Sequence, residues 1–247
     1  MSAPDCSPNE LLIATIAGLF GNARHVAVGA SSPIPGAAAL LARAQRERDH
    51  APPLRLSILG SSQHNSFTSG GVEVFDMAAQ GRIDVFFLGG GEIDGQANIN
   101  LVGTGDYPLN TVRWPGSFGS AYLYYLVPRV ILFREEHTRR TLVEKVQFVS
   151  APGASAAHVH RPGGPHGLLT SRAWFTFDKV AKRFTLASVH PEHSEAEVRE
   201  HTGFAYDCAP PVATTMVPDD ATLALLRGRV KDELAETYPQ FAQTLGS

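Results

Sequence analysis

Short, mainly apolar runs alternate with helix-like segments in the N-terminal third of the chain, and this alternation constrains the fold more than any other feature. The apolar runs cover residues 26–28, 54–59 and 83–88, with polar residues only at Arg55, Ser57 and Asp84, and the helical patterns cover about 8–20, 35–48 and 71–80. Strands that appear as nearly continuous apolar runs are typical of parallel sheets covered by helices on both faces. The sequence therefore predicts an α/β fold with a mainly parallel open sheet and flanking helices.

The remainder of the chain adds further strands and helices with recognisable signals. A five-residue polar turn separates the strand-like segments 171–177 and 183–189, which predicts an antiparallel hairpin in the C-terminal third. Capping-box patterns at Ser7 to Glu10 and at Ser194 to Glu197 predict helix starts. Further strands are expected at 130–133 and 143–146, a long loop at 150–169 and a final helix at about 219–233.

Length and composition exclude several classes of partner. The chain of 247 residues is predicted to form one domain over residues 1–247, because single α/β sheets commonly reach this size. A net charge of -3 predicts no nucleic-acid surface, and the lack of a long uncharged apolar stretch predicts no membrane span. Only Cys6 and Cys208 occur, without metal-like spacing, so we expect a reducing, cytoplasmic location.

The glycine-rich stretch GGGEIDGQANIN follows the apolar run 83–88 directly. Strand exits of this kind are where open α/β sheets present ligand-binding loops. The spacing satisfies neither GxGxxG nor a P-loop, so a nucleotide cradle is not predicted. Two interpretations remain, which are a binding site and a tight turn in which Asp94 and Asn98 bond their own backbone.

Two other turns of small residues are expected at the same edge of the sheet. LSILGSSQHN follows the run 54–59, and the PGSFG turn precedes an aromatic-rich helix whose first N–H groups could hold an anion. We therefore predict a substrate site lined by these three turns. Its binding residues are Gly60, Ser62, Gln63, Gly89, Gly90, Gly91, Asp94, Asn98, Asn100, Gly116 and Gly119.

These segments resemble the β subunits of family I CoA-transferases of the glutaconate CoA-transferase type, over residues 8–235. The stretch 89–100 is similar to the family pattern G-[AG]-x-[QE]-[IV]-D-x-x-G-N-[ILV]-N, except that Ala97 stands where the family usually has glycine. The resemblance implies a CoA-transferase fold, an acyl-CoA thioester as substrate and no tightly bound cofactor. It also implies an α subunit that completes the active site, in an α2β2 assembly.

The resemblance raises the question of the nucleophile, because the family uses a glutamate that carries CoA as a glutamyl thioester. The position that we align with it is Ser61, and no carboxylate occurs between Arg55 and Glu73. A Ser61 and His64 pair is one candidate, although GSSQH lacks the nucleophile elbow of hydrolases. Glu92 is the other candidate, either as a general base or as a carboxylate that caps backbone N–H groups.

Three functions stay open on these residues. The first is a CoA-transferase β subunit, the second is a subunit of the related hydrolases that cleave steroid rings as CoA thioesters, and the third is a non-catalytic scaffold. No metal site is predicted, because His158, His160 and His166 in the long loop have no accompanying carboxylate or cysteine.

Overall fold

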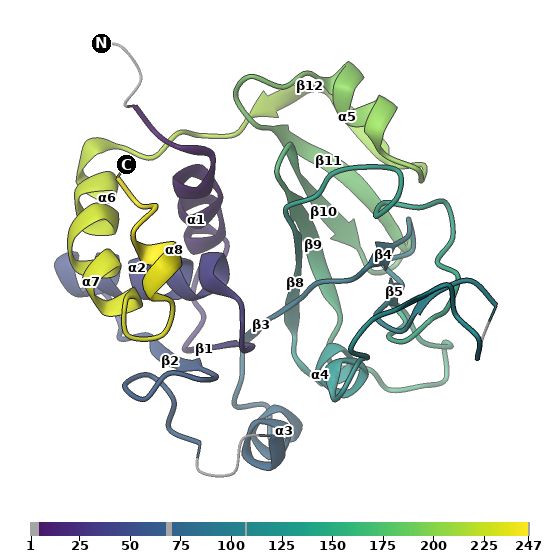
Figure 1. Ribbon diagram of the computed structural model, residues 1–247, viewed down its shortest axis with the longest axis horizontal. Coiled ribbons are helices and arrows are strands. Elements are labelled where there is room, and N and C mark those ends of the chain that lie inside the picture. Colours follow the sequence, from purple (N-terminus) through teal and green to yellow (C-terminus); the bar gives the residue numbers. More distant parts are fainter. Residues whose placement is uncertain (1–4, 68–70, 107, 247) are drawn as a thin grey trace. The chain divides into compact units, whose positions relative to one another are not determined.

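The computed structural model describes residues 5–67, 71–106 and 108–246, which form two compact units (Figure 1). The first unit contains residues up to Phe87 together with the chain from Met216 onward, and the second contains Leu88–Thr215. Each unit has its own buried apolar core and is described by itself. The single domain over residues 1–247 stays a prediction.

The first unit is a parallel three-stranded arrangement with helices, as the alternating pattern predicted. Strand β1 is paired in parallel with β2 on one side and with β3 on the other. The elements are α1 (Pro8–Gly18), β1 (His25–Val28), α2 (Pro33–Arg48), β2 (Arg55–Ile58), α3 (Gly71–Ala79), β3 (Val85–Leu88), α6 (Asp220–Leu225), the π-helical segment η1 (Leu226–Val230), α7 (Lys231–Leu234) and α8 (Pro239–Ala242).

Burial explains why these segments adopt these elements. Every residue of β1 and β3 is buried, as expected for strands covered on both faces. Helix α1 begins with the predicted capping box, in which Ser7 accepts from the N–H of Glu10 and the Glu10 carboxylate accepts from the N–H of Ser7. The C-terminal helices return to this unit and pack on α2, and Leu226 and Val230 of this segment are buried (Figure 1).

The second unit is built on a mixed sheet. Strands β8 and β9 are parallel, β9, β10 and β11 are antiparallel, and β11 and β12 are parallel. Its elements are the short strands β4 (Glu92–Ile93), β5 (Ile99–Asn100), β6 (Gly103–Thr104) and β7 (Val112–Arg113), helices α4 (Ser120–Leu126) and α5 (Glu195–His201), and strands β8 (Arg129–Arg134), β9 (Pro165–Thr170), β10 (Ala173–Asp178), β11 (Arg183–Val189) and β12 (Asp207–Thr214).

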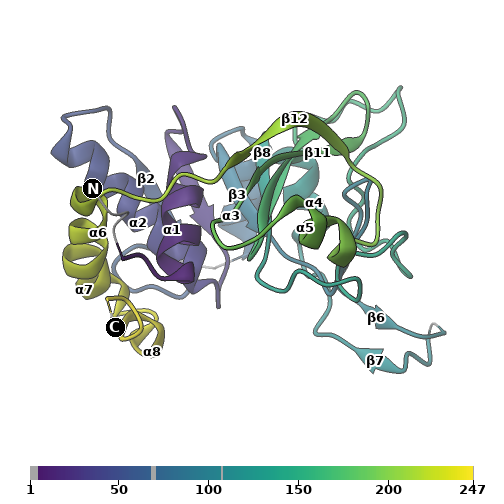
Figure 2. The ribbon, with the colours of Figure 1, turned by 90° about the horizontal axis from the view of Figure 1, so that it is seen from above.

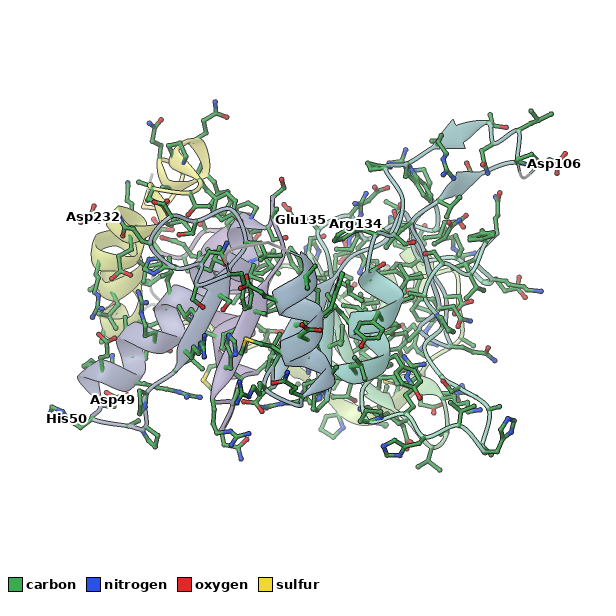
Figure 3. All side chains as sticks on the ribbon, turned by 90° about the horizontal axis from the view of Figure 1, so that it is seen from below. Asp49, His50, Asp106, Arg134, Glu135 and Asp232 are labelled. Carbon is green, nitrogen blue, oxygen red and sulfur yellow. The ribbon has the colours of Figure 1, made fainter. Side chains whose placement is uncertain are left out.

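The predicted C-terminal hairpin is confirmed as β10 and β11. Its core is aromatic, because Phe184 lies 5.0 Å from Phe177 and 5.4 Å from Phe204 between ring centroids. Aromatic pairs of this kind add to the stabilisation that burial alone provides. Figure 2 shows the β6–β7 hairpin projecting away from the strands β8 to β12, with Asp106 near its tip in Figure 3.

Two sequence-based expectations are wrong. Residues 143–146 form no strand, and the long loop ends before residue 169 because β9 already begins at Pro165. The backbone N–H groups around the expected strand have other acceptors: Val143 donates to the Ile93 carbonyl, Val146 to the Asp94 carboxylate and Gln147 to that of Glu92. Local apolar spacing contains no information about such distant acceptors.

Candidate functional site

The glycine-rich motif forms a small hairpin after β3. Residues 89–91 lead into β4, a turn spans residues 94–98, and β5 returns antiparallel with Glu92 opposite Asn100. No helix follows the glycines, which agrees with the exclusion of a dinucleotide fingerprint. The motif therefore presents a turn, held between two very short strands.

The three glycines allow close packing around this hairpin. A Cβ on Gly91 would collide with the ring of Trp114, and a Cβ on Gly90 would lie 2.6 Å from the side chain of Ile99. A Cβ on Gly89 would lie 3.1 Å from the carbonyl oxygen of Phe133. The tight exit that the sequence allowed is therefore present, while a role of Gly89, Gly90 and Gly91 in substrate binding stays a prediction.

Asp94 closes the turn through its carboxylate. Oδ1 accepts from the N–H groups of Gln96 and Asn98, both at 3.0 Å, and Oδ2 accepts from Nδ2 of Asn98 at 3.0 Å. Ala97 has φ of +60°, in the region that favours glycine, at the position where the family pattern has glycine. The predicted turn is confirmed for Asp94, which bonds its local backbone, but not for Asn98, whose side chain bonds the Asp94 carboxylate and the N–H of Gly153 instead.

Glu92 and Asn100 form a second buried pair at the base of the hairpin. Oε2 of Glu92 accepts from Nδ2 of Asn100 at 2.7 Å and from the N–H of Gln147 at 2.9 Å. The Asn100 amide oxygen also accepts from the N–H groups of Val102 and Gly103. This geometry matches the capping interpretation of Glu92, and its catalytic role stays a prediction.

Two groups distant in sequence hold the turn, and a third contacts one of them. The buried Tyr124 hydroxyl donates to the Ala97 carbonyl at 2.9 Å, and the N–H of Gly153 donates to Oδ1 of Asn98 at 3.1 Å. The guanidinium of Arg161 lies 5.1 Å from the centroid of the Tyr124 ring. Sequence reasoning missed these contacts, and the only signal was a tyrosine within the apolar pattern of α4.

The turn before α4 contains Gly116, with φ of +102°, and Gly119 as the N-cap residue. The N–H of Ser120, the first of the helix, donates to the Ser117 carbonyl at 2.8 Å. That N–H is consequently unavailable to an anion. Binding of substrate by Gly116 and Gly119 stays a prediction, and it would have to use groups of this turn other than the Ser120 N–H.

The loop after β2 belongs to the first unit and is organised by Ser61. Its buried Oγ accepts from the N–H groups of Gln63 at 3.2 Å and His64 at 2.9 Å, and its own N–H donates to the Ile58 carbonyl. Gly60 has φ of +94° and nothing would contact a Cβ there within 4 Å. Gly60, Ser62 and Gln63 are exposed, so this loop presents an open surface.

A carboxylate from the C-terminal segment contacts this loop. Ser61 Oγ donates to Oε2 of Glu236 at 2.7 Å, while the N–H and the Oγ of Ser62 both donate to Oε1 at 2.7 Å. Hydrogen bonds from Thr237, from the Ser62 N–H and from Ser61 lower the pKa of the Glu236 carboxyl to about 2. Sequence reasoning missed Glu236, because no local pattern links it to Ser61.

The candidate pair of Ser61 and His64 side chains is not formed. Nδ1 of His64 lies 3.4 Å from Nη1 of Arg43, and Nε2 lies 3.7 Å from a carboxylate oxygen of Glu233. Burial, and then the charge of Arg43, lower the pKa of the His64 imidazole. The Ser61 hydroxyl instead donates its hydrogen bond to the Glu236 carboxylate.

The three loop histidines do not form a cluster around an ion. His158 and His160 are exposed, and His166 lies on β9 with its ring 6.0 Å from that of Trp174. Across residues 5–67, 71–106 and 108–246 no group of three histidine, cysteine, aspartate or glutamate side chains is arranged to hold a metal ion. In the same residues no helix has the length and apolarity required to cross a bilayer.

Comparison with known proteins identifies the family. The family described as Coenzyme A transferase matches residues 9–201, which include both the 60–64 loop and the 89–100 hairpin. One subunit of the 3-oxoadipate CoA-transferase of Pseudomonas knackmussii is 33% identical over 162 residues, which is 63% of this chain and 62% of that protein. The chain thus matches less than two thirds of the length of this relative.

Solved structures agree in fold. The decarboxylase AibA/AibB gives a TM-score of 0.78 at 25% identity, with 98% of this chain and 99% of that chain covered. Glutaconate coenzyme A-transferase from Acidaminococcus fermentans gives 0.77 at 24% identity, with 92% and 95% covered, which is a likeness of fold alone. The predicted CoA-transferase fold is confirmed, and the chain belongs to the Coenzyme A transferase family, as a family I member of the β-subunit type.

Proposed function

We propose that this chain is the β subunit of a cytoplasmic, heteromeric enzyme that acts on an acyl-CoA thioester. The observation that carries the proposal is the family match over residues 9–201, because it includes both the loop after β2 and the glycine-rich hairpin. Coenzyme A enters as part of the substrate, and no tightly bound cofactor is needed. The two cysteines are both free thiols, which is compatible with a reducing compartment.

The three turns identified in the sequence are the proposed substrate-binding elements. The loop at 60–64 has exposed polar groups in Ser62 and Gln63. The hairpin at 89–100 has a rigid turn, because its carboxylates and amides are satisfied internally. Rigid positioning of this kind is what a site needs in order to hold a thioester in one geometry.

We further propose that an α subunit completes the active site in an α2β2 assembly. The relative from P. knackmussii is named as one subunit of its enzyme, and the name AibA/AibB indicates two different chains. Ser61 at the position that we align with the family glutamate favours, as the second candidate activity, an acyl-CoA hydrolase of the ring-cleaving type. A serine hydroxyl is a poor acyl acceptor unless a neighbouring base with a pKa near neutral pH activates it.

The test is reconstitution with a co-expressed α subunit of the same family. The complex is assayed with 3-oxoadipyl-CoA, glutaconyl-CoA and succinyl-CoA, with and without acetate as acceptor, and release of free CoA is followed together with acetyl-CoA formation. We expect turnover by the complex and none by either chain alone. Acetyl-CoA formation identifies transfer, whereas free CoA without acceptor identifies hydrolysis.

Activity of the isolated chain would contradict the two-subunit proposal. A correctly assembled complex with neither transfer nor hydrolysis over a broad acyl-CoA panel would contradict an acyl-CoA enzyme and favour the scaffold function. Asp106→Asn, at the tip of the β6–β7 hairpin, is the surface control, and the same complex with this substitution should keep full turnover (Figure 3).

A further inference from the structure

The carboxylate of Glu236 is the acidic group held at the loop after β2. Glu236 follows α7, is half-buried, and lies 175 residues from Ser61 in sequence. Its two oxygens have different partners. Oε1 accepts from the backbone N–H and the hydroxyl of Ser62, and Oε2 accepts from the hydroxyls of Ser61 and Thr237.

We propose that Glu236 is the catalytic nucleophile of this subunit, delivered to the strand exit by the C-terminal segment instead of by the loop itself. The inference rests on the proposed function, because it assumes an acyl-CoA substrate at this loop. The chain lacks a carboxylate between Arg55 and Glu73, yet the fold places one 2.7 Å from both Ser61 and Ser62. A carboxylate is an established class of covalent nucleophile.

The first step forms an anhydride. Oε2 of Glu236 attacks the thioester carbonyl carbon, a C–O bond forms, the C–S bond breaks, and the electron pair leaves with sulfur as the CoA thiolate. Hydroxyl donors can rotate away, so Oε2, which is held by the hydroxyls of Ser61 and Thr237, is the oxygen that can be released for attack. The carboxylate is ionised near neutrality, so this attack needs no base.

The second step transfers CoA to the enzyme. The CoA thiolate attacks the glutamyl Cδ of the anhydride, a C–S bond forms, the Cδ–Oε2 bond breaks, and the acyl group leaves as its carboxylate. Negative charge then develops on Oε1, which already accepts from the Ser62 N–H and Oγ at 2.7 Å each. These two donors have the geometry of an oxyanion hole.

The glutamyl thioester can then take either of two routes. An acceptor carboxylate attacks the thioester carbon, CoA leaves as thiolate, and the steps reverse to give a new acyl-CoA. Alternatively, water attacks the same carbon, its hydroxyl stays on Cδ, and its proton goes to the CoA thiolate, which gives free CoA and regenerates Glu236. The same residue thus serves transfer and hydrolysis without any further reactant.

The test locates the covalent intermediate in the unaltered complex. The complex with its α subunit is mixed with 3-oxoadipyl-CoA, glutaconyl-CoA or succinyl-CoA and reduced with borohydride, which converts a glutamyl thioester to an alcohol. Peptide mass spectrometry then identifies the modified residue. We expect the alcohol at position 236, and its loss when the thioester is omitted.

Two variants accompany this measurement. Glu236→Gln is expected to lower turnover by a factor on the order of 10⁴ or more, as for removal of other covalent nucleophiles. Ser62→Ala, which keeps the backbone N–H, is expected to lower it by about 10²-fold, as for loss of one oxyanion donor. Asp232→Asn, at an exposed carboxylate on α7 that points away from the helix in Figure 3, is expected to retain full turnover.

The outcomes separate this inference from the proposed function. Turnover with the modification on another residue of either subunit, or with no modification, overturns the role of Glu236 and leaves the acyl-CoA function standing. Absence of turnover from an assembled complex overturns both. If Glu236→Gln fails to assemble, the position of the alcohol in the unaltered complex still decides the question.

Discussion

The turn at residues 94–98 allows a charge-swap test of the motif. Asp94 accepts from three donors at 3.0 Å, and the one at Oδ2 is the side-chain amide of Asn98. In Asp94→Asn, Oδ1 can keep the N–H groups of Gln96 and Asn98, but an amide nitrogen then faces the Asn98 amide nitrogen. The substitution thus removes a hydrogen bond to a charged group, and such a bond contributes about 2 kcal/mol to the free energy of unfolding.

The reciprocal change is expected to be just as harmful alone. Asn98→Asp places a second carboxylate against Oδ2 of Asp94, so like charges replace a donor and an acceptor. The cost is again about 2 kcal/mol. In the double variant the amide at position 94 donates to the carboxylate at position 98, while the Gly153 N–H keeps its acceptor. We expect the free energy of unfolding of the double variant to lie within about 1 kcal/mol of the wild-type value. The difference that remains should come from the weak 3.5 Å hydrogen bond from the N–H of Val146 to Asp94.

The assay is urea and thermal unfolding of the four proteins under identical conditions. Each single variant should lower Tm by roughly 4–8 °C, because about 1 kcal/mol corresponds to about 2–4 °C for a chain of this size. The coupling free energy between positions 94 and 98 should be about 3 kcal/mol in favour of the double variant. A double variant whose loss equals the sum of the two single losses would show that the two side chains do not interact, and would refute the reasoning.

Three other substitutions test the surroundings of the turn and the buried histidine. Tyr124→Phe removes a donor to the buried Ala97 carbonyl and should cost about 1–3 kcal/mol in urea unfolding, whereas an unchanged midpoint would remove Tyr124 from the support of the turn. Gly153→Ala should cost about 2 kcal/mol or more, because the added Cβ would collide with the Gln96 carbonyl oxygen and lie 2.8 Å from the Ala97 backbone. The control Gly228→Ala, where the Cβ meets open space in a helix, should be neutral or stabilising by about 0.5–1 kcal/mol. Burial lowers the pKa of His137 to about 4, so as pH falls below 6.5 the unfolded chain binds a proton at this histidine before the folded chain does, and the free energy of unfolding should fall by about 3 kcal/mol between pH 6.5 and 4. His137→Asn should reduce this dependence of the free energy of unfolding on pH, and an unaltered slope would contradict the prediction.

The sequence was sufficient for the elements whose determinants are local. The capping boxes at Ser7 and Ser194 mark the starts of α1 and α5, and the five-residue polar turn marks the hairpin of β10 and β11. Asp94 closes its own turn through residues at most four positions away, and for this reason that interpretation could be made without coordinates. Failures occurred where distant groups compete for the backbone, as at Val146, whose N–H donates to Asp94 and not to a neighbouring strand.

The sequence by itself determined the α/β alternation and the local turn around Asp94, because periodicity and short-range hydrogen bonds are encoded within a few residues. It also determined the Coenzyme A transferase family, through the match over residues 9–201. Only the tertiary structure decided what holds each turn. Tyr124 reaches the Ala97 carbonyl from α4, and Glu236 reaches Ser61 and Ser62 from the C-terminal segment. A hydrogen bond between residues 175 positions apart is created by chain folding, and no spacing in the sequence records it.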